Sequence, residues 1–287
     1  MAACEMAAAL PQSYRHPVTD GGGHRRTYRE GVFASIVVAL SRPAEGRDAL
    51  VLAAQLAQAD ARMVVAHVMA TSAAPLTGGI EATMRRRASL REAGEEVYAT
   101  LGPDPRVSYL PLSGLPFAEA VIALAFRERA DAIVVGQNLV SGEPGVGQLL
   151  ADAPCPVIVA PYGHRFVRAF VPVRITVACG PPGTIDEAVG LATTLAVRAG
   201  ADVRLIAAGD ARAEEWLVHA QQLAPASAAT RVGGRGAGAL VAQTRGDVDV
   251  LVTAGADHEI LRQAACPVIV VPAAGQGAPQ VAARAQR

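Results

Sequence analysis

Glycine, histidine and cysteine are the residue types of this chain whose spacing could support chemistry, and the densest glycine run is Gly233–Gly238. Glycines in a turn between a strand and a helix let backbone amides approach a phosphate, so this run is a candidate anion site. It lacks the complete spacing of a dinucleotide-binding fingerprint and a well-placed acidic residue about 20 positions later. A plain turn is therefore the favoured interpretation.

Histidine supplies further candidates. His67 lies in an apolar run that predicts a buried strand, which favours a hydrogen-bonded core imidazole over a catalytic one. His258 follows Asp257, and such a pair could bind a metal or transfer a proton. The same residues also make a polar start to a helix, and we favour that interpretation. His16 and His24 are far apart in a segment without periodicity, so we expect a solvated tail there and not a metal site.

Several classes of enzyme are excluded by residues that the sequence lacks. All 26 basic residues are arginine, which rules out Schiff-base and P-loop lysine mechanisms. No Gly-x-Ser-x-Gly elbow and no His-Glu-x-x-His motif occurs. The cysteines Cys4, Cys155, Cys179 and Cys266 fit neither a zinc site nor a Cys-x-x-Cys motif. We expect Cys155 and Cys266, which adjoin prolines at strand starts, to be buried structural thiols and not redox sensors.

Charge and composition favour a cytoplasmic protein. The formal net charge is zero, so electrostatics give no reason to expect nucleic acid or an anionic membrane as a partner. No apolar run reaches the roughly 18 residues of a membrane span. Glu5 interrupts the first apolar stretch, which makes a poor signal peptide. Four cysteines in 287 residues are not a disulfide framework, so a reducing cytosol is the simplest compartment.

Short apolar segments alternate with amphipathic ones from Phe33 onward. The apolar segments, too short for helices and continuous in hydrophobicity, predict strands at 35–40, 63–68, 107–112, 132–135 and 157–160. The segments between them have apolar residues at helical spacing and predict helices at 49–59, 80–101 and 117–129. Alternating strands and helices indicate a parallel sheet with helices on both faces.

The same pattern then occurs a second time. The segment Ala265–Pro272 repeats the cysteine, the prolines and the apolar run of Pro154–Pro161, and 249–252 matches 131–134. The number of residues between equivalent landmarks of the two copies decreases from the first strand to the last. This decrease indicates a duplicated domain with a shorter second copy. We therefore predict a disordered N-terminal arm over 1–30, a first domain over 31–162, a degenerate second domain over 172–273 and a disordered tail over 274–287.

Three segments of the first copy, Ser113–Val121, Arg129–Gly136 and Leu149–Val159, carry a family resemblance. In order and spacing they resemble the Gly-x-Pro loop and helix, the fourth strand and the closing strand of the universal stress protein family. The resemblance covers 33–161 well and 173–272 weakly. It implies an α/β fold of two tandem doubly wound five-stranded parallel sheets, each of strand order 3-2-1-4-5, with the second copy shortened.

In doubly wound sheets a ligand lies outside the carboxyl ends of the first and fourth strands. The resemblance places such a site, with ATP as its ligand, at Leu40, Ser41, Val68, Gly136, Gly142, Gly145 and Gly147. Ser41 stands where nucleotide-binding members have Asp, and Leu139 replaces the second loop glycine. The family's Gly-Ser position holds Glu143, which repels phosphate, and Pro144, which cannot donate an amide. The surrounding glycines leave open a shifted loop that still cradles an anion.

The second copy departs further from the family pattern. Cys179 and Gly180 occupy the position of the Asp, and Gly255–His258 leads almost directly into the last helix. Because so few residues separate the fourth strand from that helix, the phosphate loop looks deleted. We therefore expect any nucleotide to bind in the first copy.

The sequence leaves three functions open. The leading hypothesis is a stress-response or signalling module that acts by binding and not by catalysis, with nucleotide binding lost or weak. The alternatives are an ATP-binding protein with slow or no hydrolysis through the first domain, and a partner-binding protein whose pockets are filled by side chains. The flat, apolar last strands at 157–160 and 268–271 invite pairing. They predict an internal pseudo-dimer of the two domains, with a homodimer and protein partners as further assemblies.

Overall fold

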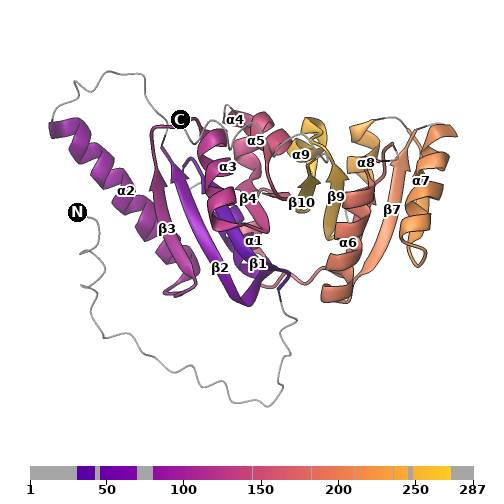
Figure 1. Ribbon diagram of the computed structural model, residues 1–287, viewed down its shortest axis with the longest axis horizontal. Helices are drawn as coiled ribbons and strands as arrows, with labels where there is room; N and C mark the ends of the chain where they lie inside the picture. Colours follow the sequence, from indigo (N-terminus) through magenta and orange to yellow (C-terminus); the bar gives the residue numbers. More distant parts are fainter. Residues whose placement is uncertain are drawn as a thin grey trace, which may run out of the picture.

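A computed structural model describes residues 31–42, 46–69, 80–143, 145–181, 183–209, 211–234, 236–244 and 248–272. The predicted arm at 1–30, the predicted tail at 274–287 and the residue Pro144 lie outside the described residues. Within them the chain forms two halves side by side, each with helices on both faces of a sheet (Figure 1). None of the described helices is both long and apolar enough to span a membrane.

The first half contains five strands connected by helices. Its elements are β1 (Phe33–Leu40), α1 (Arg47–Leu56), β2 (Ala57–Val68), α2 (Ile80–Leu101), β3 (Val107–Leu112), α3 (Phe117–Glu128), β4 (Ala132–Gly136), α4 (Gln137–Gly142), α5 (Val146–Asp152) and β5 (Val157–Ala160). A short 3-10 turn, η2 (His164–Phe166), lies in the connection to the second half.

The second half repeats this order without a counterpart of α4, and several of its elements are shorter, although α6 is longer than α1. It consists of β6 (Arg174–Ala178), α6 (Asp186–Ala199), β7 (Asp202–Ala208), α7 (Ala211–Leu223), β8 (Ala228–Val232), α8 (Ala237–Thr244), β9 (Val250–Ala254), α9 (His258–Gln263) and β10 (Val268–Val271). The largest reduction is in the middle helix, where the 13 residues of α7 correspond to the 22 residues of α2.

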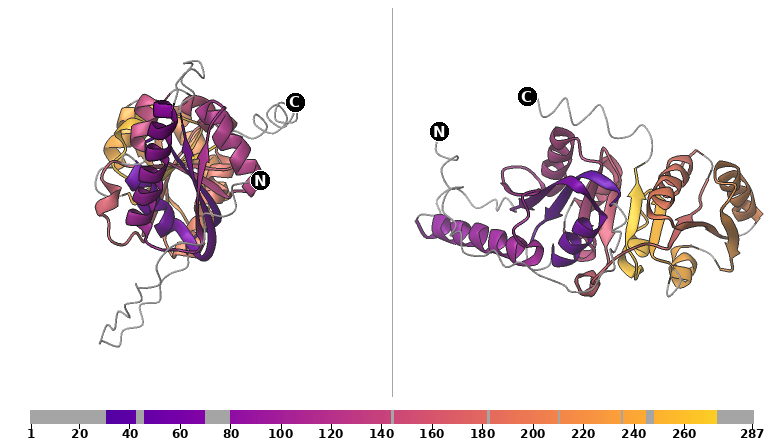
Figure 2. Two further views of the ribbon diagram at one scale, coloured as in Figure 1. Left: turned by 90° about the vertical axis from the view of Figure 1, so that its left-hand side faces the viewer. Right: turned by 90° about the horizontal axis from the view of Figure 1, so that it is seen from below.

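The predicted fold class is confirmed, because each half has strand order 3-2-1-4-5 with parallel neighbours. The two sheets are not separate, however. Strands β5 and β10 pair antiparallel, with Ile158 opposite Ile269, and this pairing joins all strands in one ten-stranded sheet. Figure 2 shows the yellow β10 between the two halves. Pairing removes both flat apolar edges from solvent at once.

Two hydrophobic cores cover the two faces of this sheet. Residues of one strand alternate between them, so that Ile36 and Val38 face one core while Val37 and Ala39 face the other. Helices α1, α6 and α7 contribute to the first core, and α3, α5, α8 and α9 contribute to the second. Both cores contain residues of both halves. Because the central strands face a core on each side of the sheet, they are continuous apolar runs.

Two aspartates repeat the same backbone contact in the two halves. The carboxylate of Asp131, just before β4, accepts hydrogen bonds from Ala34 N at 2.9 Å and Ser35 N at 3.1 Å. Before β9, the carboxylate of Asp249 accepts equivalent bonds from the backbone amides of residues 173 and 174, at 2.7 and 2.8 Å. Each aspartate thus ties the start of the fourth strand to the start of the first, which is a structural role.

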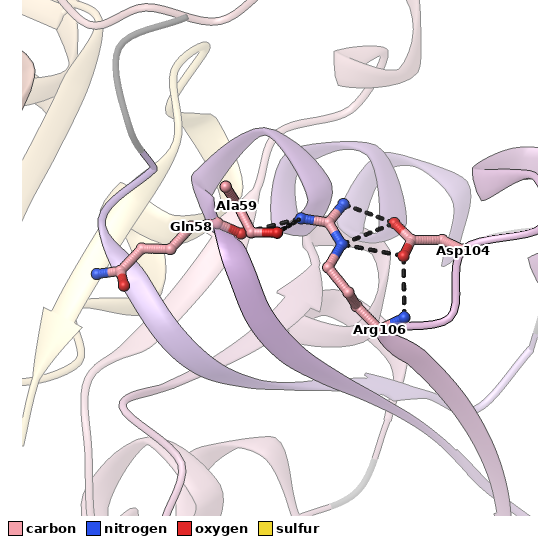
Figure 3. A network of polar contacts seen from close by, with 4 residues as sticks. All are labelled: Gln58, Ala59, Asp104 and Arg106. Carbon is pink, nitrogen blue, oxygen red and sulfur yellow. Dashed lines mark hydrogen bonds and ion pairs between the residues drawn. The ribbon is translucent and has the colours of Figure 1, made fainter.

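An arginine network fixes the loop between α2 and β3 (Figure 3). The guanidinium of Arg106 contacts the Asp104 carboxylate through Nε and Nη2, at 2.9 and 2.6 Å, and its Nη1 donates to the carbonyls of Gln58 and Ala59. The Arg106 side chain lowers the pKa of Asp104. The network holds the loop against the start of β2, which begins earlier than predicted.

The boundary between α1 and β2 differs from the prediction. The helix predicted at 49–59 ends at Leu56, and β2 begins at Ala57 without an intervening loop. Ala57 is extended and pairs with Phe33, while Gln58 Nε2 donates to the Val32 carbonyl at 3.0 Å. These contacts to β1 override the helical preference of the alanines at this point.

Side chains near the junction bind backbone groups of the second half and of the segment that connects the halves. Gln137 Nε2 donates to the carbonyls of Leu261 and Ala264 at 2.9 and 3.2 Å, and its Oε1 accepts from Tyr162 N at 2.9 Å. On the other face, the buried carboxylate of Asp48 accepts from the amides of Gly163 and Arg165. These bonds anchor α4 to α9 and the connecting segment to α1.

Replacing Gln137 by Ala should therefore lower the free energy of unfolding by about 2–3 kcal/mol, because three junction hydrogen bonds are lost. Urea denaturation of the purified protein measures this change. The matched control is Gln148→Ala on the exposed surface of α5, which should change stability by less than about 0.5 kcal/mol. Equal effects of the two substitutions would show that Gln137 does not hold the halves together.

Candidate functional site

The predicted crevice of the first half lies where β1 and β4 end side by side. Leu40, the last residue of β1, is fully buried in the core and packs against Gly46, where it leaves no room for a Cβ. Gly46 adjoins the start of α1. The side chain of Leu40 therefore fills space between the end of β1 and the beginning of α1. The half-buried Ser41 follows it and brings no charge to this position.

The neighbouring end of β2 is also closed by buried groups. Val68 is 4% exposed, and His67 beside it is 3% exposed. His67 Nδ1 lies 2.9 Å from the Tyr109 hydroxyl, and the ring also hydrogen-bonds to the backbone of Ser41. Burial lowers the pKa of His67, against the smaller opposite effect of the Ser41 bond, and raises the pKa of Tyr109 to about 12. His67 is thus a hydrogen-bonded core residue that is neutral at physiological pH.

The loop expected after β4 is a short helix instead. Gly136 ends β4 and is itself buried, and α4 begins at the next residue. Leu139, which replaces the second glycine of the family loop, is 4% exposed and packs in the second core together with Val140. A side chain that belongs to the core cannot also leave an open backbone for a phosphate. Sequence reasoning missed α4 because six residues are too few for a helical period.

The three glycines proposed for a shifted loop lie on the α4–α5 connection. Gly142 has open space where its Cβ would be, and Gly145 has φ +94° beside Ala118 of α3. A Cβ on Gly147 would lie 3.7 Å from Nε2 of His258, which belongs to α9. The structure therefore brings Leu40, Ser41, Val68 and Gly136 together at three neighbouring strand ends, whereas Gly147 faces the other half.

A second crevice lies at the equivalent position of the second half. A cavity of about 370 Å³ opens between the carboxyl ends of β6 and β9. Its walls are the loop Cys179–Pro181, Thr184 before α6, Leu240 of α8, the segment Thr253–Asp257 and Ile260 of α9. Because only Gly255–Asp257 separate β9 from α9, no long loop covers the opening. The short connection that sequence analysis interpreted as a lost site is thus what leaves this crevice accessible.

The polar groups of this cavity are hydroxyls, backbone groups and one carboxylate. Thr253 is 6% exposed and lines the cavity. Thr184 Oγ1 donates to the Pro181 carbonyl at 2.7 Å. Asp257 is the N-cap of α9, and its Oδ1 accepts from Glu259 N and Ile260 N. The polar cluster around His258 is therefore a helix start, as predicted, and the described residues contain no grouping able to hold a metal.

The other candidates from the sequence have structural roles. Gly233, Gly234 and Gly236 lie between β8 and α8, with φ of +100° at Gly234 and +76° at Gly236, and Gly238 belongs to α8. Burial raises the pKa of Cys155, Cys179 and Cys266 to about 12. These three thiols are protonated at neutral pH and are poor nucleophiles and metal ligands. Cys4, His16 and His24 lie outside the described residues.

Comparison with known proteins supports the fold alone. No protein-family model and no curated protein matches the sequence. Among solved structures, a universal stress protein from Archaeoglobus fulgidus DSM 4304 aligns with TM-score 0.58 and 14% identity, over 83% of this chain and 96% of its own. A protein of unknown function from Pseudomonas aeruginosa PAO1 aligns with TM-score 0.55 and 17% identity, over 89% and 98%. The chain therefore has a tandem universal stress protein-like fold.

The buried His67 should make stability depend on pH. The pKa of His67 in the folded state lies below the ordinary value of 6.5. The unfolded chain therefore binds a proton at this histidine at a higher pH than the folded protein does. Stability is highest above pH 6.5 and falls as the pH drops below that value, by at most about 1.4 kcal/mol per unit. His67→Gln should remove this contribution in denaturant titrations across that range. His258→Gln, at an exposed histidine, is the control; an unchanged slope in His67→Gln would contradict the assignment.

Proposed function

We propose that this protein is a universal stress protein-like module of stress response or signalling that acts by binding and does not turn over a substrate. Nucleotide binding in its first half is lost or weak in this proposal. The observation that carries it is the burial of apolar side chains at the described strand ends of the first half. Leu40 fills the end of β1, and Leu139 anchors α4 where a glycine loop would leave the backbone open.

Electrostatics support the same proposal. A nucleotide site needs an acceptor for the ribose and amides or cations for the phosphates. Ser41 supplies no carboxylate, and Glu143 at the end of α4 places a negative charge beside the expected phosphate position. Short helices such as α4 and α5 also have weaker dipoles than long ones. The first half is thus poorly matched to ATP on both its ribose and its phosphate side.

The buried reactive groups favour binding over catalysis. A general base needs a pKa near the working pH and access to substrate. His67 is enclosed by Ser41 and Tyr109, and the thiols of Cys155 and Cys179 are protonated at neutral pH. His67 borders the first crevice and Cys179 lines the second, whereas Cys155 precedes β5 at the opposite end of the sheet.

ATP binding through the first half is the second candidate function. Gly142 and Gly145 favour it, because the backbone of Gly142 is open and Gly145 adopts a conformation suited to glycine. A phosphate could approach the α4–α5 connection from this side. This candidate requires the nucleotide to do without the carboxylate that Ser41 replaces.

Calorimetry with Mg-ATP on the full chain distinguishes the two. We expect no saturable binding, with a dissociation constant weaker than about 1 mM. Gly142→Ala is the diagnostic variant, since its Cβ meets no protein atom within 4 Å and disturbs only a ligand on that backbone. Gly190→Ala in α6, equally unobstructed, is the control. Micromolar binding that Gly142→Ala weakens and Gly190→Ala retains would establish the ATP-binding alternative.

The proposal extends to assembly and compartment. In this proposal the two halves act as an internal pseudo-dimer, which the pairing of β5 with β10 supports because these are the strands whose flat apolar edges predict pairing. A homodimer would then form through another surface. We also expect other proteins to bind this protein as partners in signalling. We place the protein in the cytoplasm, in keeping with the free thiols of Cys155, Cys179 and Cys266.

A further inference from the structure

We propose that a cavity at the outer edge of the first half, between α2 and β3, binds a small, flat, uncharged aromatic molecule. β3 is the outermost strand of this half, and α2 lies beside it in Figure 1. This edge cavity, lined by 94, 97–98, 102–105, 107 and 109, lies near the amino end of β3. It is thus at the opposite end of the sheet from the crevice at Leu40 and Gly136. The inference goes beyond the proposed function, because neither crevice provides this site.

The walls of the edge cavity favour a flat aromatic ligand. Tyr98 of α2 and Tyr109 of β3 both line it, together with the rings of Pro103 and Pro105 in the loop between these elements. The Tyr98 side chain is 54% exposed, so its ring is accessible. Aromatic groups stack favourably on tyrosine rings in offset or edge-to-face geometry. The volume of about 420 Å³ falls in the usual range of small-molecule sites, roughly 300–1,000 Å³.

Two of these walls are fixed by hydrogen bonds. The Tyr109 hydroxyl lies 2.9 Å from Nδ1 of the buried His67, and the Tyr109 ring packs against the first core. The loop is held by Arg106, which binds Asp104 and the start of β2 (Figure 3). A ligand therefore binds to groups that are already ordered, which reduces the entropy lost on binding.

Gly94 is a glycine that the fold does not require. It lies well inside α2, where glycine is less favourable than alanine. Its φ is not in the left-handed region. Among the described residues, a Cβ at Gly94 would meet only the Tyr109 ring, at an ordinary contact distance of 3.8 Å. Neither backbone strain nor a steric conflict explains this glycine. Its effect is to leave bare helix backbone opposite the Tyr109 ring, which widens the edge cavity.

The charges favour an uncharged ligand. The one acidic side chain of the described lining is Asp104, and the lining contains no arginine and no histidine. Both carboxylate oxygens of Asp104 already accept hydrogen bonds from the Arg106 side chain. On the neighbouring surface of α2, the carboxylate of Glu95 is paired with Arg91. An ionic ligand would lose hydration without gaining a free countercharge.

The test is calorimetric titration of the full chain with indole as the probe and indole-3-carboxylate as its charged counterpart. We expect indole to bind with a dissociation constant below about 1 mM, and the carboxylate to bind at least about fivefold more weakly. The backbone amide NMR signals of residues 94–109 should shift on saturation with indole. Those of Ser41 and of residues 136–142, at the crevice, should not.

Two variants with matched controls test the walls. Gly94→Leu extends a side chain toward the Tyr109 ring and should weaken indole binding at least about tenfold. Its control is Gly190→Leu at an exposed glycine inside α6, which should leave the affinity unchanged. Tyr98→Ala removes a stacking surface and should weaken binding about fivefold. Its control is Tyr162→Ala, at an exposed tyrosine outside the edge cavity. Thermal unfolding of each variant confirms that the fold is intact.

Several results would overturn the proposal. These are no indole binding up to about 10 mM, equal or tighter binding of the carboxylate, amide shifts confined to the crevice, and unchanged affinity in Gly94→Leu. A second copy of the chain as the occupant would instead raise the sedimentation coefficient with protein concentration, and Tyr98→Ala would abolish that rise. ATP binding that Gly142→Ala weakens would contradict only the proposed function of the first half.

Discussion

The antiparallel pairing of β5 with β10 is the interaction on which the rest of the structure depends. Each strand is a run of four buried apolar residues at the edge of its own half, and an edge of that kind is stable only when covered. Pairing them satisfies backbone groups on both strands and lets the two cores extend across the junction. It also fixes α4 beside α9, where Gln137 bonds to the carbonyls of Leu261 and Ala264.

This junction explains why the crevices of the two halves differ, although both halves have the same order of strands and helices. In the first half the chain after β4 must reach the junction, and it does so as a helix whose Leu139 and Val140 are buried. In the second half the connection from β9 to α9 is three residues long, and Asp257 caps the helix at once. Core side chains thus fill the described strand ends of the first half, while a cavity opens at the equivalent position of the second half.

Much of the fold could be predicted from the sequence, because it is encoded in periodic and repeated segments. The repeated Cys-Pro-Val-Ile-Val segments at 155–159 and 266–270 gave both final strands, and alternation of apolar runs with helices gave the parallel order. The site was less predictable. Segment 137–142 is too short to show a period, and the short connection at 255–257, which was interpreted as a deleted loop, gave no sign of the cavity beside it.

Duplication offers a physical reason for this division between the halves. A single domain of this fold must use one set of strand ends both to bind a ligand and to prepare its edge for a partner. With two copies in one chain, the partner is always present, and the junction contacts of α4 can be optimised at the expense of the first crevice. The cavity of the second half, whose described lining contains no arginine and no histidine, stays open at the equivalent position.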